Sequence, residues 1–191
     1  MSENKDLLHR TVIKSRNGQP ILIRILSDID VSALQAFNEK LSEQTRSQFL
    51  PHQYNEKTIL QYCERNRRGV DRIYVAILQN CIIGYFFLWD FKRPFPVLGI
   101  GISDTFQGQG LGKEMMNILV EDAKTAGSKG IILTTVLSNE KAFQLYLRMG
   151  FQYLGDTDNI AGDGRVVRER MMFLPLIEGE KPDIQDFEPP V

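Results

Sequence analysis

The sequence lacks the features that define several large classes of protein. Its 191 residues include two cysteines, Cys63 and Cys81, which are too few for a disulfide framework and lack the paired spacing of a zinc site. Both lie in apolar-patterned segments, so we expect two buried free thiols. The 23 basic and 24 acidic residues leave a net charge of −1. Because nucleic-acid-binding proteins carry a basic excess or stripe, this balance argues against a nucleic-acid partner.

Long hydrophobic runs are also absent. The longest central run, residues 81–89, spans nine residues, whereas a transmembrane helix needs about 20. Residues 1–10 are polar and mixed in charge, without the apolar segment of a signal peptide. We therefore expect a cytoplasmic protein with no membrane partner.

Composition separates both ends of the chain from a central domain. Residues 1–18 are polar and include the turn pair Asn17-Gly18, so we expect an N-terminal arm. Residues 177–191 contain five acidic residues and three prolines and have no periodic apolar face. We expect this acidic tail to be disordered. Residues 19–176 have the length of one domain.

Hydrophobic periodicity switches repeatedly within this central domain. Apolar runs predict strands at 21–26, 72–79, 81–90, 97–102, 131–137, 151–154 and 166–174. Apolar spacings of three and four predict helices near 31–42, 56–66, 110–126 and 139–149. Gln79-Asn80 fits a tight hairpin turn, and a glycine-rich loop at 156–164 separates the last two strands. This order predicts a mixed α/β fold built in layers around one sheet.

A glycine loop at residues 107–113 lies between a predicted strand and a strongly amphipathic helix. It reads Gln107, Gly108, Gln109, Gly110, Leu111, Gly112 and Lys113. Alternate glycines let the backbone approach an anion, and the first turn of the helix offers free N–H groups to it. A Walker loop would need glycine at 107 and Ser or Thr at 114, and a dinucleotide loop would need glycine at 113 or 115. Neither nucleotide-binding pattern is met. Taken alone, the loop fits either an anion-binding site or a flexible turn that binds no ligand.

A second motif occupies the last predicted helix. Asn139, Ala142 and Tyr146 are three and four residues apart, so they share one helical face. Gly150 suits a left-handed residue after the helix end, and Phe151 begins the next strand. Taken alone, this motif also fits a capped helix whose Tyr146 is half-buried in the core.

The two motifs together resemble those of the GCN5-related N-acetyltransferase (GNAT) family. The family's pyrophosphate loop, Q/R-x-x-G-x-G/A, is matched by Gln107, Gly110 and Gly112. Its later helix, N-x-x-A-x-x-x-Y-x-x-x-G-F, is matched by Asn139, Ala142, Tyr146, Gly150 and Phe151. The resemblance covers residues 20–175. It implies the acyl-CoA N-acyltransferase fold, with a mixed, mostly antiparallel sheet of about seven strands flanked by about four helices.

The resemblance also implies a cosubstrate, acetyl-CoA, and no metal. The strand with Ile100, Gly101 and Ile102 would bulge and splay from its neighbour, leaving a gap for the pantetheine arm. Residues 107–112 would wrap the pyrophosphate, with Lys113 at the rim. Asn139 would contact the cofactor. Tyr146 would protonate the departing thiolate or hydrogen-bond to it.

The implied reaction is direct transfer of an acetyl group to a primary amine of a small molecule, peptide or protein. Many members place a glutamate base on the strand before the glycine loop, but residues 91–102 contain no acid. Three other residues are candidates for the base, but each has another explanation: Asp90 as a solvated strand end, Asp104 as a loop cap and His52 as a surface histidine. The base is therefore unassigned. This missing acid keeps open an alternative, a non-catalytic module that binds or senses acyl-CoA.

The acceptor side of the site is less well marked. An aromatic-polar segment could wall an amine pocket; it contains Phe49, Leu50, Pro51, His52 and Tyr54. The loop at 155–165 carries Asp156, Asp158 and Asp163, which would attract a cationic amine or remain a solvated hairpin. The oligomeric state expected is a monomer or a homodimer.

Overall fold

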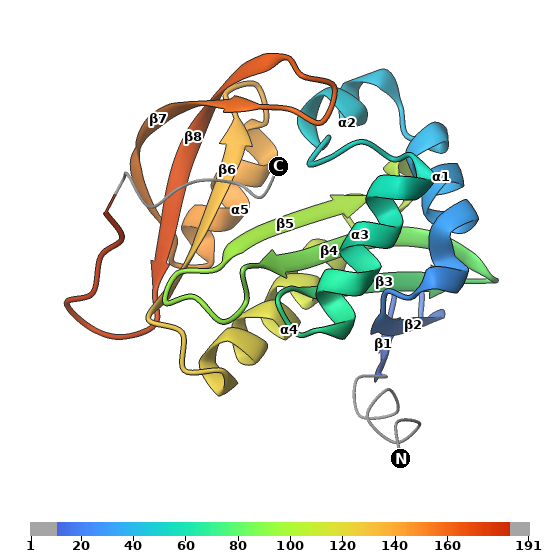
Figure 1. The fold of residues 1–191 in the computed structure, drawn as a ribbon, viewed down its shortest axis with the longest axis horizontal. Helices are drawn as coiled ribbons and strands as arrows, with labels where there is room; N and C mark the ends of the chain where they lie inside the picture. Colours follow the sequence, from blue (N-terminus) through green and yellow to red (C-terminus); the bar gives the residue numbers. More distant parts are fainter. Residues whose placement is uncertain (1–10, 184–191) are drawn as a thin grey trace.

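A single eight-stranded sheet organises the computed structural model, which describes residues 11–183 (Figure 1). The strand order is β1-β2-β3-β4-β5-β6-β8-β7, and all neighbours are antiparallel except β5 and β6. The strands are β1 (Thr11–Lys14), β2 (Pro20–Ile25), β3 (Arg72–Leu78), β4 (Cys81–Trp89), β5 (Val97–Ile102), β6 (Gly130–Val136), β7 (Gln152–Ile160) and β8 (Val166–Pro175). The helices are α1 (Val31–Lys40), α2 (Glu43–Gln48), α3 (Glu56–Arg67), α4 (Leu111–Thr125) and α5 (Glu140–Arg148). The predicted mixed, mostly antiparallel α/β fold is confirmed.

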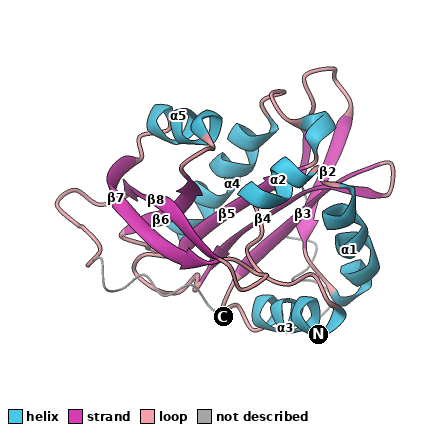
Figure 2. Ribbon diagram, turned by 90° about the horizontal axis from the view of Figure 1, so that it is seen from above, coloured by secondary structure: helices cyan, strands magenta, loops and turns pink. Residues whose placement is uncertain are grey.

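Helices cover both faces of the sheet, and each face has its own core. Figure 2 shows α4 and α5 on one side and α1 and α3 on the other. Because side chains alternate along a strand, β4 contributes to both cores. Phe86 and Leu88 pack with α4, whereas Phe87 and Trp89 pack with α1 and α3. Burial on both faces explains why this strand is an almost continuous apolar run.

Three elements differ from the sequence prediction. The sheet has eight strands instead of about seven, because β1, which lies within the predicted arm, pairs with β2 (Thr11 opposite Ile23). The short helix α2 begins after Ser42, whose hydroxyl caps it by accepting from Thr45 N; at six polar residues it carries no visible periodicity. Strand β7 continues to Ile160 through the segment predicted as a loop.

Local signals at turns and caps are confirmed. Gln79 and Asn80 both have positive φ, as a two-residue hairpin turn requires. Asn139 caps α5 by accepting from Ala142 N at 3.2 Å, and Gly150 follows the helix with φ +91°. Of the two cysteines, Cys63 is buried as expected, but Cys81 is exposed because it directly follows the hairpin turn.

The ends of the chain are only partly described. Residues 1–10 of the expected arm and 184–191 of the expected tail lie outside the described residues. The start of the tail is attached to Lys129, whose carbonyl accepts from Ile177 N at 3.1 Å and whose amine pairs with Glu180 at 2.9 Å. Within residues 11–183, no helix is long and apolar enough to cross a membrane. Nor does this range contain a group of His, Cys, Asp or Glu side chains placed to hold a metal ion.

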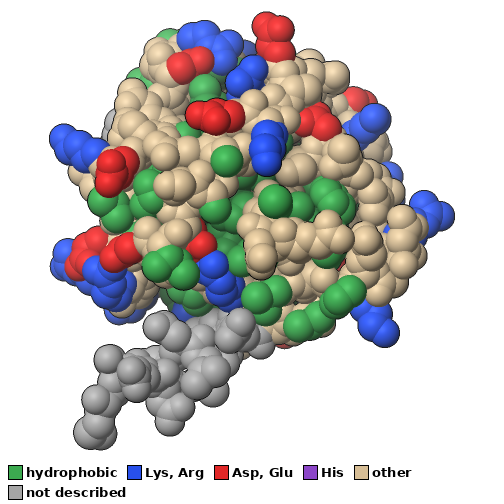
Figure 3. Space-filling view, turned by 90° about the vertical axis from the view of Figure 1, so that its right-hand side faces the viewer, with side chains coloured by type: hydrophobic (Ala, Val, Ile, Leu, Met, Phe, Trp, Pro, Cys, Tyr) green, Lys and Arg blue, Asp and Glu red, His purple; other side chains and the backbone are tan. Residues whose placement is uncertain are grey.

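The face toward which β5 runs is hollowed (Figure 3). Hydrophobic side chains gather in the central hollow of this face, and acidic and basic side chains lie around it. Beyond β5 the chain passes through a short 3-10 turn (Asp104–Phe106) into the glycine loop.

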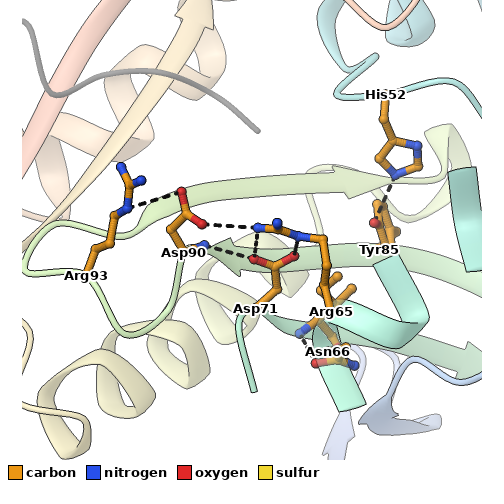
Figure 4. Close-up of polar contacts among 8 residues, drawn as sticks. His52, Arg65, Asn66, Asp71, Tyr85, Asp90 and Arg93 are labelled. Atoms are coloured by element: carbon orange, nitrogen blue, oxygen red, sulfur yellow. Dashed lines mark hydrogen bonds and ion pairs between the residues drawn. The ribbon is translucent and has the colours of Figure 1, made fainter. Parts of the chain in front are cut away.

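A buried carboxylate joins α3 to the end of β4 (Figure 4). Asp71 is 1% exposed and accepts two hydrogen bonds from Arg65, at 2.5 and 2.8 Å. It also accepts from the backbone N–H of Asp90 at 2.9 Å. The carboxylate of Asp90 pairs with Arg65 and Arg93. Asp90 therefore belongs to this structural network, which argues against a catalytic role for its carboxylate.

We expect Asp71→Ala to lower the free energy of unfolding by about 3 kcal/mol, because it leaves a partly buried guanidinium and a backbone N–H without their acceptor. Asp28→Ala is the control, since its pair with Arg67 is exposed and should contribute less than about 1 kcal/mol. Urea denaturation of both variants measures the difference. Equal destabilisation would contradict this account of the network.

His52 is buried, which contradicts the expected surface position. It is 5% exposed and its ring stacks on Tyr62 at 4.5 Å. The Nδ1 atom lies 2.7 Å from the carbonyl of Gln53, and Nε2 lies 3.0 Å from the hydroxyl of Tyr85 (Figure 4). Burial raises the pKa of Tyr85 well above its usual value, so its hydroxyl donates to Nε2 and Nδ1–H donates to Gln53. Burial lowers the pKa of His52 to about 4.

This low pKa makes stability depend on pH. An unfolded histidine takes up a proton near pH 6.5, whereas folded His52 does so only near pH 4. Between these values the unfolded chain binds the extra proton, so stability falls as the pH drops from 6.5 to 4, by up to about 3 kcal/mol. We expect His52→Gln to lack this part of the slope, as measured by urea denaturation across the range. Parallel pH curves for the two proteins would refute the prediction.

Candidate functional site

The parallel strands β5 and β6 meet at one position and then diverge. Val97 pairs with Ile132, and Ile132 N donates to the carbonyl of Pro96 at 3.0 Å. No further pairing between these strands is recorded in the described part of the chain, whereas β5 stays paired with β4 along its whole length. A gap therefore opens between β5 and β6.

Backbone polar groups of β5 face this gap. In an extended strand, alternate residues direct their N–H and C=O to the same side. The Pro96 carbonyl faces β6, and the Ile102 carbonyl accepts from the side chain of Gln107 at 3.0 Å. Leu98 and Ile100 have the same parity, so they present their N–H and C=O groups to the gap.

The bulge that the resemblance implied in β5 is absent. The register with β4 is continuous from Trp89 opposite Val97 to Gly84 opposite Ile102. The two glycines have a different role, because they make room for aromatic rings. A Cβ atom at Gly99 would lie 2.2 Å from the ring of Phe87, and one at Gly101 would lie 2.2 Å from the ring of Phe49.

The glycine loop is open on its outer side. Gly108 and Gly110 have φ values of +73° and +87°, and a Cβ atom at either would meet nothing within 4 Å. Lys113 N and Glu114 N donate to the Gly110 carbonyl. Among the described residues, no backbone acceptor is recorded for the N–H groups of Leu111 and Gly112. These donors begin the 15-residue helix α4, so the loop has the geometry of an anion site.

Side chains within the loop hold its shape. Gln107 Nε2 donates to the Ile102 carbonyl and to the Thr45 hydroxyl at 3.2 Å, and Gln109 Nε2 donates to the Thr105 carbonyl at 2.7 Å. The loop is thereby fastened to β5 and α2, which leaves its backbone as the surface that faces outward.

Asp104 fastens the same region to α2. Its carboxylate accepts from Ser42 N at 2.9 Å and from the hydroxyls of Ser42 and Thr45 at 2.6 Å each. These hydrogen bonds lower the pKa of Asp104 to about 2. Because its oxygens are engaged, the loop-capping interpretation of Asp104 fits better than a role as catalytic base.

Two basic residues near the glycine loop were missed by sequence reasoning. Lys14, at the end of β1, and Arg16, just after it, line a hollow together with Gly108, Gly110 and Glu114. Both cations belong to the segment assigned to the arm, and only the pairing of β1 with β2 brings them here. Lys113, which the sequence placed at the rim, is exposed.

Tyr146 lies on α5 in the core that includes α4. It is 9% exposed, and its ring packs against Phe151. Burial and, to a smaller extent, the charge of Glu169 raise the pKa of Tyr146 to about 12. The hydroxyl therefore remains protonated at neutral pH and is suited to donate a hydrogen bond.

A cavity of about 110 Å³ lies on the other face of the sheet. We call it the aromatic cavity, after the wall formed by Phe49, Phe87 and Trp89. A row of polar side chains on three strands also lines the cavity: Thr134 on β6, Glu169 on β8 and Asn159 on β7. Asn159 Nδ2 donates to Glu169 Oε2 at 2.6 Å and to the Thr134 hydroxyl at 3.2 Å.

The hairpin between β7 and β8 closes the cavity. Gly162 N donates to the Leu50 carbonyl at 2.8 Å. A Cβ atom at Gly162 would lie 2.3 Å from the carbonyl carbon of His52, so only glycine permits this approach. The predicted aromatic-polar wall is therefore divided. Phe49, Leu50 and Pro51 line the cavity, whereas the side chains of His52 and Tyr54 lie in the aromatic cluster behind it.

The acidic residues predicted in the hairpin loop do not line this cavity. Asp158 pairs with Arg168, and Asp163 pairs with Arg165. Asp156 accepts from the hydroxyl of Tyr153 at 2.7 Å. The polar row of the cavity, including Glu169, comes instead from positions on β6, β7 and β8 that no local motif marks.

Comparisons with known proteins identify the family of this chain. A model of the acetyltransferase (GNAT) family matches residues 34–151. Over 69 residues the chain is 38% identical to a spermine/spermidine N(1)-acetyltransferase of Bacillus subtilis (strain 168), which covers 36% of this chain and 45% of that relative. Over 66 residues it is 32% identical to N-acetyltransferase family 8 member 3 of Mus musculus, covering 35% of this chain and 29% of that relative. These matches span less than half the length of either relative.

Solved structures share the fold at low sequence identity. The GNAT domain of S. lividans PAT superposes with a TM-score of 0.71 at 15% identity, covering 87% of this chain and 97% of that chain. The structure of yncA from Salmonella typhimurium with its cofactor acetyl-CoA superposes with a TM-score of 0.65 at 18% identity, covering 86% and 98%. The family model covers more than half of the chain and the fold agrees with it, so this chain belongs to the acetyltransferase (GNAT) family.

Proposed function

We propose that the protein is an acetyl-CoA-dependent N-acetyltransferase that acts on a primary amine of a small molecule, peptide or protein. The observation that carries this proposal is the gap between β5 and β6, with the outward backbone groups of β5 along it and the open glycine loop beyond the end of β5. An anion-binding loop alone would suit many ligands. A gap in the sheet with backbone donors and acceptors beside the loop suits a long ligand that continues from its phosphates as a strand-like arm.

The residues present fit acetyl-CoA. Backbone N–H groups of residues 107–112 would hold the pyrophosphate, with positive charge supplied by Lys113, Lys14 and Arg16. The N–H and C=O groups of Leu98 and Ile100 would pair with the pantetheine arm, and one such N–H would stabilise the oxyanion. Asn139 would contact the cofactor from the start of α5. Bound there, acetyl-CoA supplies the acetyl group as a thioester.

Tyr146 is the proposed acid. Its hydroxyl, protonated at neutral pH, would donate to the departing sulfur. We specify the acceptor only as a molecule with a primary amine. Spermine and spermidine belong in the first acceptor screen, because the Bacillus subtilis relative is named for them.

The glycine loop can be tested by a matched pair of substitutions. Gly110→Glu places a carboxylate where the pyrophosphate would lie, and we expect it to weaken acetyl-CoA binding at least about 100-fold by charge repulsion and steric block. Gly164→Glu is the control, because Gly164 has nearly the same φ, +85° against +87°, and equally open space. Calorimetric titration with acetyl-CoA, beside ATP and NAD, measures both. Unchanged binding by Gly110→Glu would overturn the assignment of this loop.

Substitution of Tyr146 separates an enzyme from the alternative, a non-catalytic acyl-CoA-binding or sensing module. We expect Tyr146→Phe to lower kcat about 100-fold while acetyl-CoA affinity is retained, since only the donated proton is lost. Tyr153→Phe is the control, because Tyr153 is exposed. Release of free thiol during turnover of an accepted amine gives the rate. Unimpaired turnover by Tyr146→Phe would remove the proposed acid.

A further inference from the structure

Glu169 is an isolated negative charge in the aromatic cavity. It is the single charged side chain among the described residues that line the cavity. Its Oε2 accepts from the uncharged amide of Asn159, and no hydrogen bond or ion pair is recorded for its Oε1 within residues 11–183. The neighbouring Arg168 and Arg170 lie in other pairs, with Asp158 and Glu140. Strand alternation places both arginines on the opposite face of β8.

The aromatic part of the same lining is suited to the apolar body of a cation. The rings of Phe87 and Trp89 stack at 4.2 Å with 17° between their planes, and both line the cavity. The indole Nε1 of Trp89 is buried without a recorded hydrogen-bond partner in the described structure. Tyr62 stacks on Trp89 as well, at 5.4 Å, so these rings offer an apolar wall, while the carboxylate supplies the attraction for an ammonium group.

The cavity also lies at the right place relative to the gap. It is lined by Val97, Leu98 and Gly99 of β5 and by Thr134 and Val136 of β6, the strands that diverge. The charge of Glu169 acts on Tyr146, which packs in the core of the other face. A nucleophile held by Glu169 would therefore approach the gap from the side opposite Tyr146.

We propose that Glu169 receives the acceptor: its carboxylate binds the ammonium group of a primary amine whose apolar carbon body lies against Phe87 and Trp89, and it then takes one ammonium proton. This inference rests on the proposed function, since it assigns the acceptor side of the same site. At about 110 Å³, the cavity has room for an amino group with a small carbon body, a few water-sized groups in all.

The proton transfer balances with the proposed reaction. One proton moves from the ammonium nitrogen to Glu169 and frees a nitrogen lone pair. That lone pair forms the N–C bond at the acyl carbon while the C–S bond breaks. The nitrogen loses a second proton, which balances the proton gained by the sulfur. Glu169 then returns its proton to solvent, so each turnover releases one proton.

Trp89 provides a binding signal that does not depend on turnover. It is the only tryptophan of the chain, so the intrinsic fluorescence reports on the cavity wall. We would titrate the full chain, with and without CoA, with propylamine and with its neutral analogue 1-propanol. We expect Glu169→Gln to weaken propylamine binding about tenfold or more and to leave 1-propanol binding unchanged. Glutamine retains an oxygen that accepts from Asn159, so the row of polar side chains is kept.

Asp158→Asn is the matched control, because Asp158 is an exposed carboxylate on the same hairpin, paired with Arg168. It should bind both probes as the wild type does. Equal affinity of Glu169→Gln and wild type for propylamine would overturn the proposal. Failure of propylamine to bind the wild-type protein would equally overturn the substrate class.

The pH profile distinguishes a base from a structural carboxylate. The neighbours of Glu169 on β6 and β7 are Thr134 and Asn159, which do not titrate. Tyr146 stays protonated between pH 7 and pH 9, because its pKa is raised to about 12. Without Glu169 the amine must lose its proton before it binds, so we expect kcat/KM of Glu169→Gln to fall about 100-fold or more at pH 7 and to recover about tenfold per pH unit toward pH 9. A constant loss at every pH would contradict the role as base.

Failure of this inference can be told apart from failure of the proposed function. Acetyl-CoA binding and amine acetylation that are insensitive to Glu169→Gln would leave the proposed function intact and remove Glu169 from it. Glu169-dependent amine binding in a protein that does not bind acetyl-CoA would leave the amine site intact and overturn the proposed function.

Discussion

The divergence of β5 from β6 is the constraint on which the rest of the site depends. Unpaired backbone groups in a sheet that is covered on both faces are costly unless a ligand or water satisfies them. Here Leu98 and Ile100 carry such groups, because the two strands pair only where Val97 meets Ile132. The glycine loop lies beyond the end of β5, Tyr146 lies in the core of one face, and the aromatic cavity lies on the other. If the two strands stayed paired, no gap would remain through which one ligand could reach the glycine loop, Tyr146 and the aromatic cavity.

The parts of the site that the sequence predicted are those carried by short stretches of chain. A helix cap, a two-residue turn and a loop of alternate glycines each depend on neighbouring residues alone, so Asn139, Gln79-Asn80 and Gly110 were found from local pattern. The fold class followed for the same reason, from the alternation of helix and strand periods. The polar row of the cavity could not be found this way. Thr134 and Glu169 become neighbours only because β6 and β8 lie side by side in the sheet.

Burial and close approach account for the remaining errors. His52 follows Pro51 in a polar segment and has the sequence context of a surface residue, but the hairpin tip at Gly162 packs against its backbone and α3 brings Tyr62 onto its ring. The glycines of β5 are a similar case. A sequence records that a side chain is missing at Gly99, but it does not record that the ring of Phe87 occupies the space. Both facts depend on partners that are distant in the chain.

The two ionisable groups proposed to act at the gap have opposite requirements. Tyr146, in its proposed role as acid, must hold its proton until the thiolate leaves, whereas Glu169, in its proposed role, must start without one. The negative charge of Glu169 serves the first requirement, since it helps to raise the pKa of Tyr146. A bound ammonium group would offset that charge, and the pKa of Tyr146 would fall. Tyr146 would then become a better acid once an acceptor is in place. Binding of the acceptor and protonation of the leaving group would be coupled across the gap by electrostatics.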